Sequence, residues 1–185
     1  MQKTARGPVQ IIGDLFASEG GADYLGEAVS QAVHMLQAAA LAECAGAPSA
    51  LIAASLLHDV GHIAGPVSGR DLIEGTENFH SEQGAAWLSQ WFGPEVTEPV
   101  RLHVQAKRYL CAVEPGYVDK LSPASRHTLE VQGGPMSLAE QAEFEANPYA
   151  EAACMVRRWD DAAKNPDVPV PPFHHFAPVL SSLAR

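Results

Sequence analysis

The sequence has few cysteines, little positive charge and no long hydrophobic run, and each shortage excludes a class of protein. Its three cysteines, Cys44, Cys111 and Cys154, lie far apart and form no CxxC pair, which disfavours a disulfide framework and a thiolate zinc site. The formal net charge is -10 and the Lys and Arg residues are scattered. This charge balance argues against a nucleic-acid partner.

Membrane insertion and secretion are also disfavoured. No apolar run reaches about 18 residues, and the N-terminal segment lacks a long apolar stretch before a small-residue cleavage site. We therefore expect no membrane partner and place the protein in the cytoplasm. The length suits one hydrophobic core. We predict a single domain over 1–185, with a short N-terminal extension (about 1–20) and a Pro-rich C-terminal tail (about 165–185).

Helical patterns cover most of the chain. Residues 26–45 are rich in Ala, Leu, Gln and Glu, with apolar residues at intervals of three and four. Residues 49–62 are apolar on nearly all sides, which predicts a helix buried in the middle of the domain. Further helices are expected at about 81–92 with Ser81 as N-cap, at 97–112, at 122–132, after the capping box Ser137–Glu140, and at 148–164. With no alternating strand pattern the fold class is all-α, with a loop over 63–79 and a tail without regular structure.

The segment LLHDVGHIAG, residues 56–65, is the most informative part of the sequence. Its apolar helix ends in His58 and Asp59, and His62 follows one helical turn later. Similar side chains occur in or beside the other predicted helices, at His34, His80, His103, Asp160 and Asp161. A single His in a helix is usually a hydrogen-bonded core residue, but burying all of these groups without partners would cost several kcal/mol each. A shared metal is the simplest compensation.

The donor types indicate which metals fit. Imidazoles and carboxylates without thiolates suit iron, manganese or a catalytic zinc. Four His and two Asp are too many for one ion that keeps an open position. If Asp59 bridges, six side chains can hold two ions about 3.5 to 4 Å apart.

The order His34, then His58-Asp59, then Asp160 resembles the H…HD…D signature of the HD-domain superfamily, an all-helical fold of mostly metal-dependent phosphohydrolases. Five segments resemble one subset more closely: DYLGE (23–27), HDVGH (58–62), HVQAKRYL (103–110), LSPASRHTLEVQGGPM (121–136) and RRWD (157–160). This subset comprises the diiron oxygenases that break the carbon–phosphorus bond of 1-hydroxylated aminoethylphosphonates. The resemblance covers about residues 23–160, and it implies an HD-domain helical bundle.

The resemblance also implies cofactors, substrate and ligands. The cofactor would be a mixed-valent Fe(II)/Fe(III) pair, with O2 as co-substrate. The substrate would be a small organophosphonate, an (R)-1-hydroxy-2-(amino or trimethylamino)ethylphosphonate, and the products phosphate and glycine or glycine betaine. By similarity, one iron would be held by His34, His58, Asp59 and Asp160, and the other by Asp59, His80 and His103.

The phosphonate needs cations in an acidic protein. Lys107 follows His103 by one helical turn and His62 follows His58 in the same way, so both share a face with a metal ligand. The resemblance adds Ser125 and Arg157 as substrate contacts. The alternatives are a solvated Lys107, a helix cap at Ser125, and an ion pair of Arg157 with Asp160 or its neighbour.

Three further assignments remain open in the sequence. The resemblance makes Tyr24 and Glu27 a catalytic gate, although an ordinary N-terminal turn would also explain them. Asp161 could replace Asp160 as ligand, since adjacent residues differ by about 100° around a helix. We expect surface or packing roles for the remaining histidines, which are His127, His174 and His175.

Two other functions compete with the oxygenase. One is a metal-dependent phosphohydrolase for a nucleotide or another phosphomonoester, and the other is a non-catalytic nucleotide-binding module. Physical reasoning on the residues alone does not separate the oxygenase from the phosphohydrolase. The amine group of the substrate also stays open, and no oligomeric state is predicted.

Overall fold

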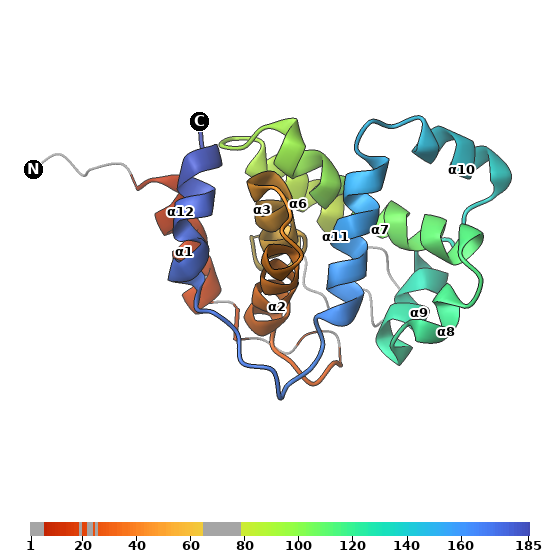
Figure 1. The fold of residues 1–185 in the computed structure, drawn as a ribbon, viewed down its shortest axis with the longest axis horizontal. Helices are drawn as coiled ribbons and strands as arrows, with labels where there is room; N and C mark the ends of the chain where they lie inside the picture. The colour runs from red at the N-terminus through yellow and green to blue at the C-terminus, as the bar shows by residue number, and fades with distance from the viewer. Residues whose placement is uncertain (1–5, 19, 22–23, 25, 65–78) are drawn as a thin grey trace, which may run out of the picture.

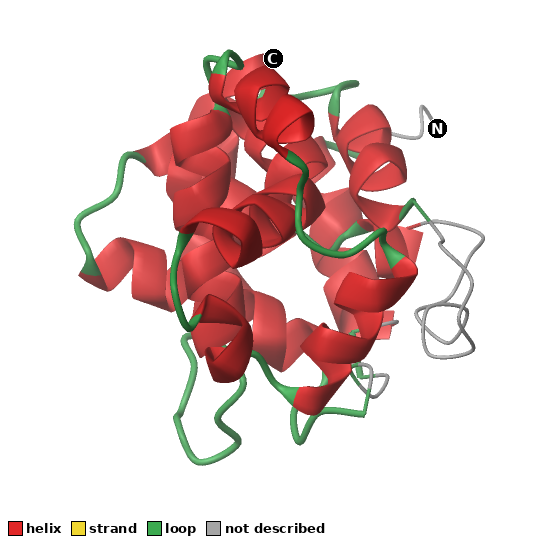
Figure 2. Cartoon of the chain, turned by 90° about the vertical axis from the view of Figure 1, so that its right-hand side faces the viewer, coloured by secondary structure: helices red, strands yellow, loops and turns green. Residues whose placement is uncertain are grey.

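The computed structural model describes residues 6–18, 20–21, 24, 26–64 and 79–185, and within them the chain forms helices and no strand (Figure 2). The all-α prediction is confirmed. The helices are α1 (Pro8–Ser18), α2 (Gln31–Cys44), α3 (Ser49–Leu57), α4 (Gly61–Ala64), α6 (His80–Leu88), α7 (Pro94–Val113), α8 (Tyr117–Lys120), α9 (Pro123–Val131), α10 (Leu138–Glu145), α11 (Ala150–Ala162) and α12 (Phe173–Leu183).

The helices form a bundle around α3 and α7. Helix α11 packs against α7 on one side and α2 on the other, while α6 packs along α7 and α4 (Figure 1). Helices α1 and α12 lie together at one end of the molecule, and α8, α9 and α10 lie at the opposite end. The six predicted metal ligands lie on or directly beside the helices between these two ends.

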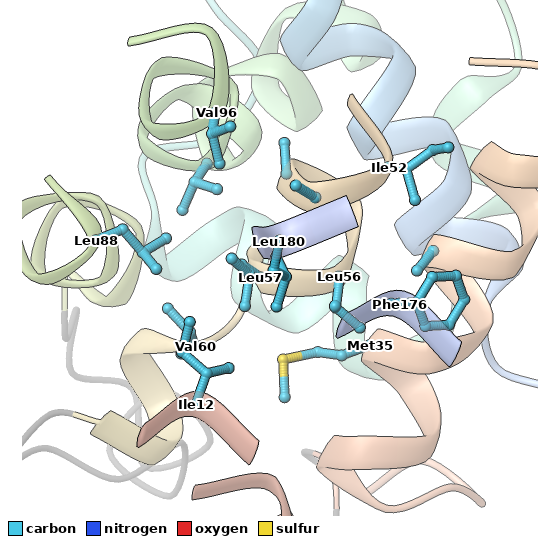
Figure 3. Close-up of a cluster of buried hydrophobic side chains, with 14 of the residues drawn as sticks. Ile12, Met35, Ile52, Leu56, Leu57, Val60, Leu88, Val96, Phe176 and Leu180 are labelled. Atoms are coloured by element: carbon cyan, nitrogen blue, oxygen red, sulfur yellow. The ribbon is translucent and has the colours of Figure 1, made fainter. Parts of the chain in front are cut away.

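Helix α3 is buried, as its apolar sequence predicts. Leu56 and Leu57 are inaccessible to solvent and pack with Val60 of the following turn in the main core (Figure 3). A helix that is apolar all round can be accommodated only where other helices cover every side. The core therefore holds the C-terminal end of α3, and with it the His58-Asp59 pair, at the centre of the protein.

The C-terminal tail differs from the prediction, because residues 173–183 form helix α12. Phe176 and Leu180 are four residues apart, so they share one helix face, and both are fully buried in the core. Helix α1 uses the same spacing at Ile12 and Phe16. The prolines at 171 and 172 precede α12 rather than interrupt it, which is a position that helices tolerate.

Helix ends agree in part with the predictions. Ser122 caps α9, and Ser137 forms the expected capping box with Glu140. The helix expected over 26–45 begins later than predicted, at Gln31, with Ser30 as its N-cap. Ser81 is not an N-cap, because α6 begins one residue earlier and the Ser81 hydroxyl donates to Glu82 at 2.8 Å. Of the predicted loop over 63–79, residues 65–78 lie outside the described residues.

None of the described helices is both long enough and apolar enough to cross a membrane. The single-domain organisation stays a prediction.

Candidate metal centre and substrate pocket

Six buried His and Asp side chains converge in the middle of the bundle. They come from separate parts of the fold: α2, the turn between α3 and α4, the start of α6, α7 and α11. They are the six predicted ligands His34, His58, Asp59, His80, His103 and Asp160, and each is buried. The fold thus brings together residues that are as many as 126 positions apart in the sequence.

One set of donor atoms lies on the α2 and α11 side. The Nε2 atoms of His34 and His58 are 3.0 Å apart, and Asp59 Oδ2 lies 3.7 and 3.6 Å from them. Asp160 completes the set, with Oδ1 at 3.3 Å from His34 Nε2. Donors about 2.1 Å from one metal ion are about 3.0 to 3.5 Å apart, so this set is close to the shape of a coordination shell.

A second set lies on the α6 and α7 side. The Nε2 atoms of His80 and His103 are 3.2 Å apart, and Asp59 Oδ1 lies 3.4 and 3.3 Å from them. Asp59 therefore directs one carboxylate oxygen toward each set. This is the arrangement expected of a carboxylate that bridges two ions.

The hydrogen bonds of the histidines show that the cluster fits cations. The Nδ1 atoms of His34, His58 and His103 lie 2.7 to 2.8 Å from main-chain carbonyl oxygens, to which each must donate a proton. In neutral rings the Nε2 lone pairs then face one another across the cluster. Asp59 Oδ2 and Asp160 Oδ1 are buried and accept no hydrogen bond. Metal ions would satisfy all of these atoms at once.

The pKa values of the cluster agree with metal binding. Burial lowers the pKa of His58 to about 4, so its imidazole is neutral at pH 7. Burial alone would raise the pKa of Asp59, but the neighbouring His58, His103 and His80 outweigh it and hold that pKa well below its usual range. His58 is therefore neutral and Asp59 is ionised at pH 7, which are the protonation states in which these side chains bind metals.

Glycines allow the two sides of the cluster to approach. A Cβ atom on Gly61 would lie 2.0 Å from the carbonyl oxygen of His80, and one on Gly84 would lie 3.0 Å from the Gly61 nitrogen. Only glycine lets α4 contact α6 this closely. The glycine in HDVGH thus positions His80 relative to Asp59, a role that the sequence did not reveal.

His62 lies beside the second set of donors. Its ring stacks on His80 with centroids 4.1 Å apart, and its ring nitrogens are within 4.8 Å of the donor atoms of Asp59 and His80. Burial, followed by the nearby His80, lowers the pKa of His62 to about 3. The residue lines the pocket, as expected of a substrate contact, and is also within reach of a metal bound at the second set.

A pocket extends from the cluster to α9, and cationic side chains form part of its wall. Lys107 is only 2% exposed and donates to Thr128 Oγ1 at 2.9 Å, so the alternative of a solvated lysine is wrong. Burial, and then the adjacent Arg157 guanidinium, lowers the pKa of Lys107 to about 7. Ser125 lines the same wall and does not cap α9, because Ser122 does.

Arg157 connects the two ends of the pocket. Its Nη1 lies 2.7 Å from Asp160 Oδ2, while Nη2 contacts Asp161 and lies 3.5 Å from Ser125 Oγ. The ion pair and the position on the pocket wall therefore occur together. Asp161 takes no part in the cluster, since its carboxylate binds Arg157 and accepts from the Tyr117 hydroxyl at 2.6 Å.

Tyr24 and Glu27 lie at the pocket, although the Asp23 and Leu25 of their motif lie outside the described residues. The Tyr24 ring stacks on His34 with centroids 3.9 Å apart. Burial, followed by Asp59 and Asp160, raises the pKa of the Tyr24 phenol well above 10. Glu27 accepts a hydrogen bond from the Ser122 hydroxyl at 2.5 Å.

Three polar residues of the pocket were missed in the sequence: Thr128, Gln132 and Lys164. Helical spacing could have found them, since Thr128 is three residues after Ser125, Gln132 is four after Thr128, and Lys164 is four after Asp160. The histidines expected to have surface or packing roles, His127, His174 and His175, are exposed and lie outside the pocket, and His175 pairs with Glu43 at 2.8 Å.

An all-helical bundle with buried His and Asp clusters defines a class of metal-binding enzyme, and comparison with known proteins identifies it. The HD domain model matches residues 32–160. The chain belongs to the HD-domain family.

Its relatives specify the chemistry further. It is 44% identical to a [1-hydroxy-2-(trimethylamino)ethyl]phosphonate dioxygenase (glycine-betaine-forming) of Leisingera caerulea, over 95% of this chain and 89% of the relative. It is also 44% identical to a hydroxymethylphosphonate dioxygenase of Gimesia maris, over 84% of this chain and 78% of the relative. An uncharacterized protein of Acanthamoeba polyphaga mimivirus is 33% identical, over 91% and 78%. The protein is therefore an oxygenase of the HD-domain family that uses O2 and binds metal.

Proposed function

We propose that this protein is a diiron oxygenase that cleaves the carbon–phosphorus bond of an (R)-1-hydroxy-2-(amino or trimethylamino)ethylphosphonate. The products would be phosphate and glycine or glycine betaine. The single observation that carries the proposal is the Asp59 carboxylate, which turns one oxygen toward each of two buried donor sets. The names of two relatives support the phosphonate as substrate.

The ligand sets proposed from the sequence agree with this geometry. One iron would be held by His34, His58, Asp59 and Asp160, and the other by Asp59, His80 and His103, as an Fe(II)/Fe(III) pair. Such a pair would supply the redox chemistry that activates O2 and oxidises C1 of the substrate. Main-chain carbonyls hold three of the four imidazoles in the tautomer that this role requires.

The phosphonate would bind the cationic wall. Lys107, Arg157 and Ser125 line the pocket beside the cluster. A phosphonate placed between them would neutralise two buried cations, and its oxygens could accept from all three side chains. Arg157 would also hold Asp160 in place through their ion pair. His62 lines the pocket beside the second donor set and would face the reacting carbon.

Tyr24 and Glu27 would control access and recognise the amine. The Tyr24 ring covers His34 and excludes water from that side of the cluster, and its raised pKa keeps the phenol protonated at pH 7. Among the described residues that line the pocket, Glu27 is the only carboxylate outside the proposed ligand sets. A cationic group on C2 of the substrate would be attracted to it.

Oxygen dependence tests the proposal directly. The substrates would be 2-amino-1-hydroxyethylphosphonate, its trimethylammonium analogue, hydroxymethylphosphonate and a nucleoside monophosphate. We expect about one O2 consumed per phosphate released and no reaction without air. The co-product should be glycine from the amino substrate and glycine betaine from the trimethylammonium substrate. The ratio of kcat/KM values then identifies the preferred amine. Phosphate release from the nucleotide under anaerobic conditions, with no phosphonate consumed in air, would overturn the proposal.

The bound metals give an independent test. Protein isolated with iron present should contain about two irons per chain, as two donor sets require. A single tightly held zinc in active protein would contradict the diiron assignment. The cytoplasmic location and the absence of a nucleic-acid partner stay predictions.

A further inference from the structure

Lys164 is a pocket residue to which the proposed reaction gives no role. It follows the C-terminal end of α11, and its side chain is only 12% exposed. Its Nζ donates to Ser125 Oγ at 2.8 Å, lies 3.3 Å from Glu27 Oε1, and lies 5.8 Å from the centre of the Tyr24 ring. The lysine therefore lies between the Glu27 carboxylate and the wall that would bind the phosphonate.

The turn that carries Lys164 is held rigidly. The Gln37 side chain of α2 donates to the Asn165 carbonyl at 2.5 Å and accepts from the Asn165 nitrogen at 3.2 Å. The carbonyl of Ala163, the residue before Lys164, accepts a hydrogen bond from His34 Nδ1 at 2.8 Å. The backbone on both sides of Lys164 is thus attached to α2, which fixes where the ammonium group can reach.

Glu27 already has a cationic partner inside the protein. Its side chain is 14% exposed, and Lys164 and the Ser122 hydroxyl both contact Oε1. At this degree of burial a carboxylate is screened only weakly by water, so its charge must be balanced by a nearby cation. A substrate with a cationic group on C2 competes with Lys164 for Glu27, whereas a substrate without one leaves the Glu27–Lys164 pair intact.

We infer that Lys164 is a specificity-determining residue: as the internal counter-ion of Glu27, it sets the discrimination between 1-hydroxyphosphonates with and without a cationic group on C2. This inference rests on the proposed function, and it adds the residue that sets substrate preference. Removing the lysine leaves Glu27 available to a substrate cation. Retaining it favours substrates that carry no such cation.

The test compares kcat/KM for the trimethylammonium substrate and for hydroxymethylphosphonate. We expect Lys164→Met to shift the ratio about tenfold toward the trimethylammonium substrate. In this variant the substrate cation can pair with Glu27 without displacing the lysine. Lys164→Arg should keep the wild-type ratio. If one of the two phosphonates is not turned over, its affinity is measured instead as the inhibition constant for turnover of the other.

Two control variants separate this role from a general loss of binding. Lys107→Met removes a cation from the wall shared by all phosphonates, so it should lower both kcat/KM values by the same factor. Glu27→Gln should shift the ratio away from the trimethylammonium substrate. Adding Lys164→Met to Glu27→Gln should then change the ratio less than twofold, since the group on which the lysine acts is gone.

Iron content and far-UV circular dichroism establish that each variant is folded, and Lys164→Gln replaces Lys164→Met if the latter is not. A ratio within twofold of wild type in folded Lys164→Met or Lys164→Gln would overturn the inference while leaving the proposed function intact. If wild-type enzyme consumes none of the three 1-hydroxyphosphonates in air, the proposed function fails, and the inference fails with it.

Discussion

The two ends of the pocket are built in different ways. At the metal end, the imidazoles of His34, His58 and His103 are oriented by main-chain carbonyls of the helices. At the phosphonate end, side chains orient one another, as in the Lys107–Thr128 and Lys164–Ser125 hydrogen bonds. Backbone atoms of a buried helix have little freedom to move, whereas a side-chain network can be altered one residue at a time.

This difference separates the residues that should control metal binding from those that should control substrate preference. Changes at the metal end should remove ions and abolish the reaction, because the donors act as a set. Changes at the cationic end should alter affinity and substrate preference while the ions stay bound. Arg157 belongs to both ends, since it contacts Asp160 and lies close to Ser125.

The largest effect is expected at Asp59, the residue shared by both donor sets. Asp59→Ala should remove both ions and lower kcat at least about 10³-fold, since the bridging donor and its charge are lost together. Elemental analysis measures the occupancy. His103→Ala is the matched control and should mainly empty the second set. Equal loss of both ions from the His103 variant would contradict the division into two sets.

Gly61→Ala should have the next largest effect, although the residue is no ligand. The added Cβ would meet the His80 carbonyl, so His80 must move away from Asp59. We expect less than one ion at the second set and about 10²-fold lower kcat, measured by elemental analysis and O2 consumption. Gly7→Ala, where a Cβ meets nothing within 4 Å, serves as control. Full iron content in Gly61→Ala would show that the close approach is dispensable.

Lys107→Ala should act on substrate and not on metal. We expect KM for the phosphonate to rise about ten- to hundredfold while iron content stays at the wild-type value, because a buried phosphonate loses one charged partner. Steady-state kinetics and iron analysis on the same preparation check this. An unchanged KM would remove Lys107 from the phosphonate wall.

The pH dependence of phosphonate binding should follow Lys107. Its folded-state pKa is lowered to about 7, so the side chain loses its positive charge as pH rises through that value. Since kcat/KM reports groups of the free enzyme, it should fall above about pH 7 for the wild type. Lys107→Arg, which stays charged, should move this fall to higher pH. A profile that is identical in both proteins would assign the titration to another group.

Tyr24→Phe should give the smallest change. The ring can still stack on His34, so we expect full iron content and kcat within about tenfold of wild type. The absorption spectrum of the resting enzyme should nevertheless change, because the phenol that lies against the cluster is gone. Superimposable resting spectra would exclude a guarding role for the hydroxyl group.

The sequence predicted which His and Asp side chains come together, and it did so for a physical reason. Histidines and carboxylates in apolar helices are costly to bury, so their presence at His34, His58 and Asp59 already indicated a shared compensating ion. Helical spacing then placed Lys107 beside His103 and His62 beside His58. The five motifs extended this to the oxygenase family, which the comparisons confirm.

The C-terminal part of the chain was predicted less well. Its prolines obscured the spacing of Phe176 and Leu180, and the burial of these residues depends on a core surface that other helices provide. Ser81 is a residue type that often caps helices, but α6 begins at His80. The N-cap position is taken by Phe79, whose φ of 50° is left-handed. At the start of α6, which is also part of the site, tertiary packing therefore overrides the local capping preference.

The sequence by itself therefore determined the helical class, the donor types and the order of the proposed ligands, because these depend on local periodicity and on the chemistry of each side chain. Only the tertiary structure decided that Asp59 directs one oxygen to each donor set, that Gly61 permits this approach, and that Lys164 lies against Glu27. These contacts join residues from distant parts of the chain, and their geometry follows from how the helices pack.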